Sequence, residues 1–479
     1  MKQREPLSSV DRAWLRMESE DNPMMITAVM VLESPLDMRR FRRVLRERLL
    51  AFDRFRQRVV RRGDAAWWSE DPHFNLNNHV HIVGLPGQAG KRELEQLVGD
   101  LASTPLDFRH PLWQTHIVDH YHQGSVVIAR LHHCIADGIA LVQVLLSLTD
   151  ESPEPEVHPV KARSRRRPSL NPSRRVLGSA QRLARVLLGE ALTLARRPGR
   201  IRELADQAFH VSEALAYVGL MPRDPPGPLK GQLCGRKRVA WATPLDLAEV
   251  KRIAHALDGT VNDVLMTTAT GALRNYLGAQ NQAIERGIHV TVPFNLRPLD
   301  QPIRSLGNRF GFVIAHMPID IPGVRARYEA VREHMRALKH SPQPMIFYGM
   351  LNAFGWGSDR LERTALNILS DKATLLMTNV PGPQKPLYIA GSRLLQPMVW
   401  APQSGHIGLG LTIFSYAGEV QFGVVADTNL IPRPSELARQ FTESFAELVR
   451  EVDAGSTPTK STARKRRPPS TPPPDSSIG

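Results

Sequence analysis

The sequence has few cysteines and no long apolar run. Its 479 residues include two cysteines, Cys134 and Cys234, which form no C-x-x-C pair, so we expect neither a disulfide framework nor a cysteine zinc site. No stretch approaches the roughly 18 consecutive apolar residues of a membrane-spanning helix, and the first residues lack the apolar core of a secretion signal. We therefore expect a cytoplasmic protein.

Positive charge is concentrated in two segments. The formal net charge is +15, and residues 161–238 hold 18 Lys and Arg against 5 Asp and Glu, while the tail from residue 455 holds 5 against 1. The remaining chain is nearly neutral, and its length exceeds the roughly 100 to 200 residues of one domain. Composition predicts an N-terminal half (1–150), a basic crossover linker (151–235), a C-terminal half (236–454) and a disordered tail (455–479).

Hydrophobic periodicity predicts strands and helices in both halves, which favours a mixed α/β class. Ser9 is the expected N-cap of a first helix. Further helices are predicted at 37–50, 91–102, 247–257, 261–277 and 434–452. Strands are predicted at 25–32, 55–60, 65–68, 79–83, 114–121, 126–131, 236–241, 289–292, 311–317, 374–378, 394–399, 407–415 and 419–426.

Residues 126–138 contain the strongest candidate site. The β-branched run 126–131 predicts a buried strand, and Asp137-Gly138 predicts a turn into an apolar helix. His132 and His133 then lie at a strand-to-helix junction, where alternation along a strand points their side chains to opposite sides. Only one of the two imidazoles is expected to face a given cavity.

Three chemistries are compatible with this stretch. His132, His133 and Asp137 could bind a metal ion, although adjacent histidines on a strand point apart. Cys134 could act as a nucleophile, although it would face away from His133 and a small apolar role suits it better. His133 could act as a general base toward a hydroxyl or an amine, a role that accelerates reactions by roughly 10²- to 10⁴-fold. The strand geometry favours the third, which needs no metal.

The motif His132-His133-Cys134-Ile135-Ala136-Asp137-Gly138 resembles the active-site motif of the CoA-dependent acyltransferase superfamily, which includes chloramphenicol acetyltransferase and the condensation domains of peptide synthetases. Four further stretches resemble the bacterial wax ester synthase/diacylglycerol acyltransferase family and occur in the family's order: Pro6-Leu7-Ser8-Ser9-Val10-Asp11, Pro111-Leu112-Trp113, Asn262-Asp263-Val264-Leu265 and Asn379-Val380-Pro381-Gly382-Pro383. The resemblance runs from about Pro6 to Val452. It implies a chloramphenicol acetyltransferase-like fold of two similar mixed-sheet halves with a tunnel between them.

The resemblance also implies a reaction. A long-chain fatty acyl group would pass from acyl-CoA to diacylglycerol, giving triacylglycerol, or to a long-chain fatty alcohol, giving wax ester. His133 would be the general base, while His132, Asp137 and Gly138 would have structural roles, with Arg297 as a candidate salt-bridge partner of Asp137. Acyl-CoA is a substrate, and no cofactor is expected. Two alternatives stay open: a soluble alcohol or amine acceptor on the same fold, and an inactive protein that binds lipid surfaces.

Other residues have less direct roles in this interpretation. Thr378 and Asn379 are candidates for stabilising the oxyanion, although the family usually has serine where this chain has Thr378. Asn262 and Asp263 are expected to be structural, because Thr260 followed by Asp263 is a capping-box pattern. The Pro111-Leu112-Trp113 triplet is expected to pack the core or line the acyl tunnel.

The basic linker suggests where the protein acts. Between residues 174 and 197 a helical period places Leu and Ala on one side and five arginines on the other. Such a helix suits peripheral docking on the inner face of the plasma membrane or on lipid droplets, where a diacylglycerol or alcohol acceptor would reside. A surface helix packed on its own protein is the alternative interpretation. Nucleic acid is not an expected partner, since the segment lacks interleaved aromatics.

Overall fold

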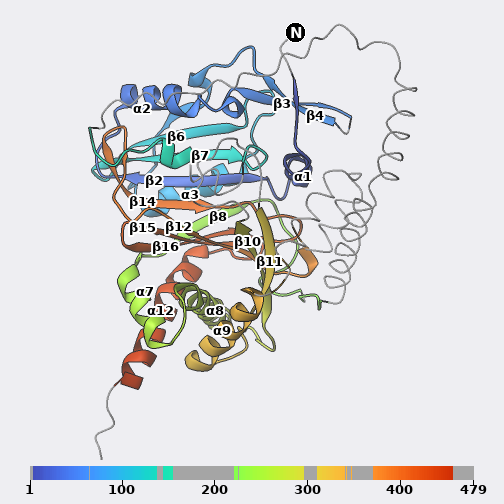
Figure 1. The fold of residues 1–479 in the computed structure, drawn as a ribbon, viewed down its shortest axis with the longest axis vertical. Coiled ribbons are helices and arrows are strands. Elements are labelled where there is room, and N and C mark those ends of the chain that lie inside the picture. The colour runs from blue at the N-terminus through green and yellow to red at the C-terminus, as the bar shows by residue number, and fades with distance from the viewer. Residues whose placement is uncertain are drawn as a thin grey trace, which may run out of the picture.

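The computed structural model describes residues 4–63, 65–136, 144–154, 221–224, 226–295, 310–339, 341, 343, 347 and 370–456. Asp137, Gly138, Arg297 and the basic segment 174–197 therefore lie outside the described residues. Within the described ranges, the strands form two large sheets and a small one, with helices on the outer faces of the large sheets (Figure 1). No helix in these ranges is both long enough and apolar enough to cross a bilayer.

The first large sheet belongs mostly to the N-terminal half. Its described strands follow the order β13-β14-β2-β7-β6-β5, and the pairing is antiparallel except between β5 and β6. The strands are β2 (Met25–Leu32), β5 (Val80–Val83), β6 (Trp113–Tyr121), β7 (Gly124–His132), β13 (Tyr388–Ile389) and β14 (Ser392–Trp400). Helix α2 (Met38–Val44) packs on this half through Phe41 and Val44 and continues as the π-helical turn η1 (Leu45–Leu49).

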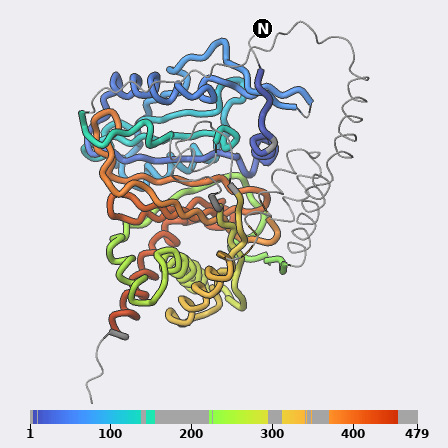
Figure 2. Tube along the Cα trace, viewed as in Figure 1, coloured from blue at the N-terminus to red at the C-terminus, as the bar shows by residue number. Residues whose placement is uncertain are grey.

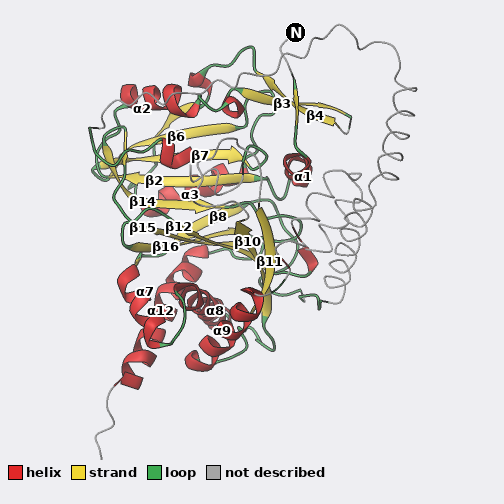
Figure 3. Ribbon diagram, in the orientation of Figure 1, coloured by secondary structure: helices red, strands yellow, loops and turns green. Residues whose placement is uncertain are grey.

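The second large sheet and its helices form the C-terminal half (Figure 3). Its described strands are β11 (Phe310–Met317), β10 (Ile288–Asn295), β12 (Leu375–Pro381), β15 (Leu409–Tyr416), β16 (Glu419–Asp427) and β8 (Lys237–Trp241) in that order, with β9 (Leu245–Asp246) also paired to β16. The helices below it are α7 (Leu247–Ala256), α8 (Val261–Ala279), α9 (Val324–Lys339) and α12 (Pro434–Ser456). The central helix α8 is apolar or small-sided on most of its surface, which is why it can be buried among the others.

Three smaller elements complete the N-terminal half. β1 (Glu5–Pro6), β4 (Ala65–Glu70) and β3 (Gln57–Arg62) form the small sheet. Helix α1 (Ser9–Met17) follows β1 directly, and the loop after it leads into β2. Helix α3 (Lys91–Ser103) lies against β8, the last strand of the other sheet, so it joins the two halves.

The C-terminal part of the chain contributes a long strand to the first sheet. β14 comes from the C-terminal part of the chain but pairs antiparallel with β2, and Figure 2 shows this late segment running beside the early strands. An apolar core lies where the two sheets meet, with members from β2, β7, α3, β8, β14 and β16, including Trp241 and Trp400. The halves are therefore joined by backbone pairing as well as by side-chain packing.

Most of the predicted elements are present, and the short strands β1, β9 and β13 were not among the predictions. Three further differences concern helices. The N-cap of α1 is Ser8, whose hydroxyl accepts the Asp11 N–H, so the prediction of Ser9 is wrong by one residue. The helix predicted at 37–50 ends as α2 at Val44 and continues in a π-helical turn. Helix α9 is absent from the predictions, because its many Arg residues leave too few apolar residues at helical spacing to mark one face.

Candidate active site

The backbone of the histidine pair is held from both sides. β7 is a central strand of its sheet, and its alternate residues enter the N-terminal core and the core between the halves. At its end the His132 N–H donates to the Leu112 carbonyl (3.0 Å), and the His133 N–H donates to the Met24 carbonyl (2.8 Å). The first bond ties the pair to the start of β6 and the second ties it to the start of β2.

The His132 ring is fixed in a single tautomer. The Cys134 N–H donates to its Nδ1 (3.0 Å), and a backbone N–H can only donate, so Nδ1 carries no proton. The proton of the neutral ring therefore lies on Nε2, which donates to the Glu18 carboxylate (2.5 Å). Phe108 packs edge-on against the ring, which is fully buried. Both ring nitrogens of His132 are thus already in use.

The His133 ring lies in a different environment. It stacks on the indole of Trp14 in α1, with 4.0 Å between ring centroids and 22° between ring planes. The residue is 5% exposed, so a reacting group can approach it only where the packing opens. The stacked indole restricts rotation of the imidazole and fixes the plane in which its nitrogens lie.

Cys134 is unsuited to nucleophilic chemistry. Its side chain is completely buried, and burial raises the pKa of the thiol well above its usual value, with Asp11 and Glu18 adding to the effect. A thiol that stays protonated is a poor nucleophile, because the thiolate is the reactive form. Among the described residues, no cluster of three or more His, Cys, Asp or Glu side chains could hold a metal ion.

The Pro111-Leu112-Trp113 triplet supports the site from the β6 side. Leu112 and Trp113 are buried, and the Leu112 carbonyl accepts the His132 N–H. The Trp113 indole N–H donates to the Phe55 carbonyl (2.9 Å), and its ring stacks on His79 at 4.6 Å. Trp113 packs in the N-terminal core and also lines an apolar cavity.

The structure brings two of the other candidate stretches together. The Asn379 amide at the end of β12 donates to the Asn262 side-chain oxygen at the start of α8 (2.7 Å), and both side chains are exposed. Thr378 lies one residue earlier, where its hydroxyl donates to the Thr412 hydroxyl on β15 (3.1 Å). These side chains already have partners within the C-terminal half.

Asp263 has the structural role predicted from its spacing. It is buried, and its carboxylate accepts the Thr260 N–H (2.8 Å) while the Thr260 hydroxyl accepts the Asp263 N–H (3.2 Å). These reciprocal bonds form a capping box at the start of α8. The prediction of a capping box is confirmed. Asn262 takes no part in the box, and its side chain accepts a hydrogen bond from Asn379 instead.

Two apolar cavities are lined in part by strands of the sheet that carries the histidines. Each has a volume of about 40 Å³, and Met30 and Leu145 line both of them. Four residues of β7 line the first cavity: Val127, Ala129, Arg130 and Leu131. Three of them, Val127, Ala129 and Leu131, alternate along the strand face that runs toward position 133. Neither histidine lines these cavities, and each has room for only a few water-sized groups.

Sequence patterns did not identify two residues that contact the pair. Glu18 follows the last residue of α1, and Trp14 lies in the middle of that helix, more than a hundred residues before the histidines. An acidic residue after a helix has no spacing that would relate it to a distant strand. Only the tertiary fold, which places α1 against the end of β7, shows both contacts.

The chain was compared with known proteins at the levels of family, sequence and fold. The model of the wax ester synthase/diacylglycerol acyltransferase catalytic domain matches residues 7–265, and the model of that family's C-terminal domain matches residues 306–449. A protein of Mycobacterium tuberculosis (strain H37Rv), named as a probable diacylglycerol O-acyltransferase, is 28% identical over 470 residues, covering 92% of this chain and 95% of the relative.

Solved structures confirm the predicted fold class. The wax ester synthase/diacylglycerol acyltransferase of Marinobacter aquaeolei VT8 superposes with a TM-score of 0.67 at 21% identity, covering 94% of this chain and all of that one. The first condensation domain of the CDA synthetase superposes with a TM-score of 0.57 at 14% identity, covering 93% and 96%. With both family models matched along its length, the chain belongs to the wax ester synthase/diacylglycerol acyltransferase family.

Proposed function

We propose that this protein is an O-acyltransferase that moves a long-chain fatty acyl group from acyl-CoA to the hydroxyl of diacylglycerol or of a long-chain fatty alcohol. Membership of the family supports acyl transfer, and the name of the mycobacterial relative supports diacylglycerol as an acceptor. No cofactor enters this reaction, because the thioester already activates the acyl group.

The state of His132 supports assigning the base to His133. Nδ1 of His132 accepts a backbone N–H and Nε2 donates to Glu18, so His132 cannot take up a proton without losing one of these bonds. A general base needs a nitrogen that can receive the proton of the acceptor. Of the two imidazoles at the end of β7, the base is therefore His133, and His132 has a structural role.

The proposed reaction has two proton transfers and no acyl-enzyme. His133 removes the hydroxyl proton as the acceptor oxygen bonds to the thioester carbonyl carbon. The tetrahedral intermediate then collapses, the carbon–sulfur bond breaks, and the proton passes from His133 to the departing CoA sulfur. The buried thiol of Cys134 takes no part, since burial raises its pKa and keeps it protonated.

The oxyanion of the intermediate needs a fixed donor, worth about 2.7 to 4 kcal/mol in comparable enzymes. Thr378 and Asn379 remain our candidates. Each is held by a neighbour, Thr412 and Asn262 respectively, so its position is defined before substrate binds. For either to act, its donor group must leave or share that partner in the transition state.

The acyl chain is expected to extend along the two apolar cavities. Their linings are almost wholly apolar, and the first one continues the β7 face that leads to His133. Because each cavity is only about 40 Å³, a long chain must displace side chains such as Met30 and Leu145, which line both cavities. Each buried methylene would contribute roughly 0.8 kcal/mol toward that displacement.

We further propose that the protein docks on the inner face of the membrane or on lipid droplets through segment 174–197. A helical period over these residues would place five arginines opposite the Leu and Ala side chains, a pattern typical of interfacial helices. Deleting residues 174–197 should reduce sedimentation with vesicles that contain anionic lipid. Equal sedimentation of the deletion variant and the intact protein would reject docking through this segment.

One assay tests the reaction and its alternatives. Purified protein is mixed with palmitoyl-CoA and either dioleoylglycerol, hexadecanol or a soluble amine, and the ester or amide product is identified. His133→Ala should lower the rate by about 10²- to 10⁴-fold, whereas His132→Ala should retain a measurable part of it. Equal losses would contradict the division of roles, product from the soluble acceptor alone would favour the condensation-like alternative, and no product at all would favour a lipid-binding protein.

A further inference from the structure

The loop between α1 and β2, residues 18–24, holds both histidines. The carboxylate of its first residue, Glu18, accepts a hydrogen bond from His132 Nε2. The carbonyl of its last residue, Met24, accepts a hydrogen bond from the His133 N–H. Within the loop, the Asn22 N–H donates to the Ser19 hydroxyl (3.1 Å), which closes a compact turn. The placement of both imidazoles thus depends on where this loop lies.

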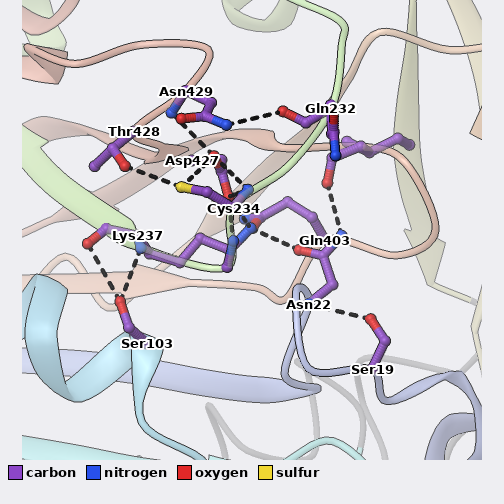
Figure 4. A network of polar contacts seen from close by, with 12 residues as sticks. Ser19, Asn22, Ser103, Gln232, Cys234, Lys237, Gln403, Asp427, Thr428 and Asn429 are labelled. Atoms are coloured by element: carbon purple, nitrogen blue, oxygen red, sulfur yellow. Dashed lines mark hydrogen bonds and ion pairs between the residues drawn. The ribbon is translucent and has the colours of Figure 1, made fainter.

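The middle of the loop is bound to the C-terminal half through the side chain of Asn22 (Figure 4). The Asn22 amide is 1% exposed and donates to the carbonyls of Gly405 (2.8 Å) and Ile407 (3.0 Å). Its oxygen accepts a hydrogen bond from Nζ of Lys237 on β8 (2.6 Å). All of these partners lie more than 200 residues away in the sequence. The loop is therefore part of the N-terminal half of the chain, but its hydrogen bonds attach it to the C-terminal half.

The charge of Lys237 is balanced at the end of β16. Asp427 is fully buried, its carboxylate lies 3.8 Å from the Lys237 Nζ, and it also accepts the backbone N–H groups of Cys234, Gly235 and Asn429. Burial lowers the pKa of Lys237, and the carboxylate of Asp427 opposes that shift. We call Asn22, Lys237 and Asp427 the interdomain clamp.

A close backbone approach reinforces the clamp. Gly235 has a φ of +75°, and a Cβ there would lie 3.2 Å from the Glu20 carbonyl oxygen and 3.3 Å from the Asp21 Cα. The chain that enters β8 is therefore packed directly on the loop. A buried cation that donates a hydrogen bond on one side and faces a carboxylate on the other has a defined position. Such an arrangement fixes geometry more than it adds stability.

We propose that Asn22 and Lys237 are positioning residues: the interdomain clamp sets the loop, and through Glu18 and Met24 the loop sets His132 and His133. The proposal rests on His133 as the base of the proposed function. It predicts that loosening the clamp lowers the rate of the chemical step while the substrate sites stay intact. A displacement of about 1 Å at reacting groups is enough to cost about 100-fold in rate.

The test uses the full-length protein with Lys237→Met, which removes the charge and keeps the length of the side chain, and Asn22→Ala, which removes the amide without touching the charge. Each variant should lower kcat by about 10- to 100-fold, with less than about a twofold change in KM for palmitoyl-CoA. In spectra of protein labelled with ¹⁵N at histidine, His132 should change from one tautomer to a mixture of two. The His132 signal is assigned by its loss in His132→Ala.

Lys230→Met is the matched control. Lys230 is a half-buried lysine whose pKa burial also lowers, and its Nζ donates to the carbonyls of Ser370, Asp371 and Ala373, away from the loop. This variant should lose thermal stability and keep the wild-type kcat and His132 tautomer. If Lys237→Met or Asn22→Ala behaves like Lys230→Met, the positioning role is wrong. Should Lys237→Met fail to fold, Asn22→Ala decides alone.

The two proposals can fail separately. Absence of acyl transfer by the intact protein would reject the proposed function. The tautomer of His132 would still report on the clamp, because it is read without substrate.

Discussion

Replacing Glu18 by Ala tests whether this carboxylate holds the histidine pair. The Glu18 side chain is 14% exposed and that of His132 is 1% exposed, so their 2.5 Å contact is largely shielded from water. Glu18→Ala leaves the buried Nε2–H of His132 without its acceptor, which costs about 1 to 3 kcal/mol. Glu18→Gln keeps an acceptor oxygen and loses only the charge, a difference of about 1 kcal/mol.

The effect on catalysis should exceed the effect on stability. Without Glu18, the His132 ring can rotate and release the Cys134 N–H, which moves the backbone that carries His133. We therefore expect kcat to fall by about 100-fold in Glu18→Ala and by less than about tenfold in Glu18→Gln. Stability is measured by urea unfolding and activity by CoA release from palmitoyl-CoA with a diacylglycerol acceptor.

Asp224→Ala is the control for a loss of stability alone. Asp224 makes the same kind of contact with His289, where its Oδ1 lies 2.7 Å from Nδ1, but in the C-terminal half and without a tie to the histidine pair. It should lower the free energy of unfolding at least as much as Glu18→Ala and leave kcat near the wild-type value. A Glu18→Ala protein with normal kcat, or an Asp224→Ala protein that loses as much activity, would refute the reasoning.

Three further predictions follow from single residues. Cys134→Ala should keep acyl transfer within about threefold of wild type, since its raised pKa excludes the thiolate; a loss of two orders of magnitude would restore the nucleophile hypothesis. Burial, with Arg130 and His81 nearby, lowers the pKa of His116 to about 4, so between pH 6.5 and 4 the unfolded chain binds a proton that the folded chain does not. The free energy of unfolding should therefore fall by about 3 kcal/mol as the pH is lowered across that window. The urea midpoint should fall less steeply with decreasing pH in His116→Phe than in the wild type, and parallel pH profiles of the two proteins would contradict this. Thr260→Val should cost about 1 kcal/mol by removing the cap of α8, and an unchanged urea midpoint would count against it.

Local patterns in the sequence predicted the elements that carry the site. The alternation and β-branching of residues 126–131 predicted β7, and the polar residues at 260 and 263 predicted the cap of α8. These features are local, because they depend on propensity and on side chains within one turn or one strand.

Long-range partners could not be predicted in this way. The partner of β14 is β2, although both strands are apolar and could have paired within their own halves. Glu18, Asn22 and Lys237 are charged or polar residues that would ordinarily lie in solvent, and only the fold buries them beside each other or beside a histidine. The resemblance in motifs pointed to His133 as the proposed base, but the residues that contact the two histidines could only be found in the structure.

The late strand in the first sheet has a consequence for synthesis on the ribosome. β14 begins 260 residues after β7 ends, so at about 5 to 20 residues per second the first half waits about 13 to 52 s for its last long strand. Throughout that interval the free backbone of β2 is an open template for another nascent chain. Expression of residues 1–150 alone should therefore yield aggregates, and supplying the 388–400 hairpin as a separate peptide should rescue solubility.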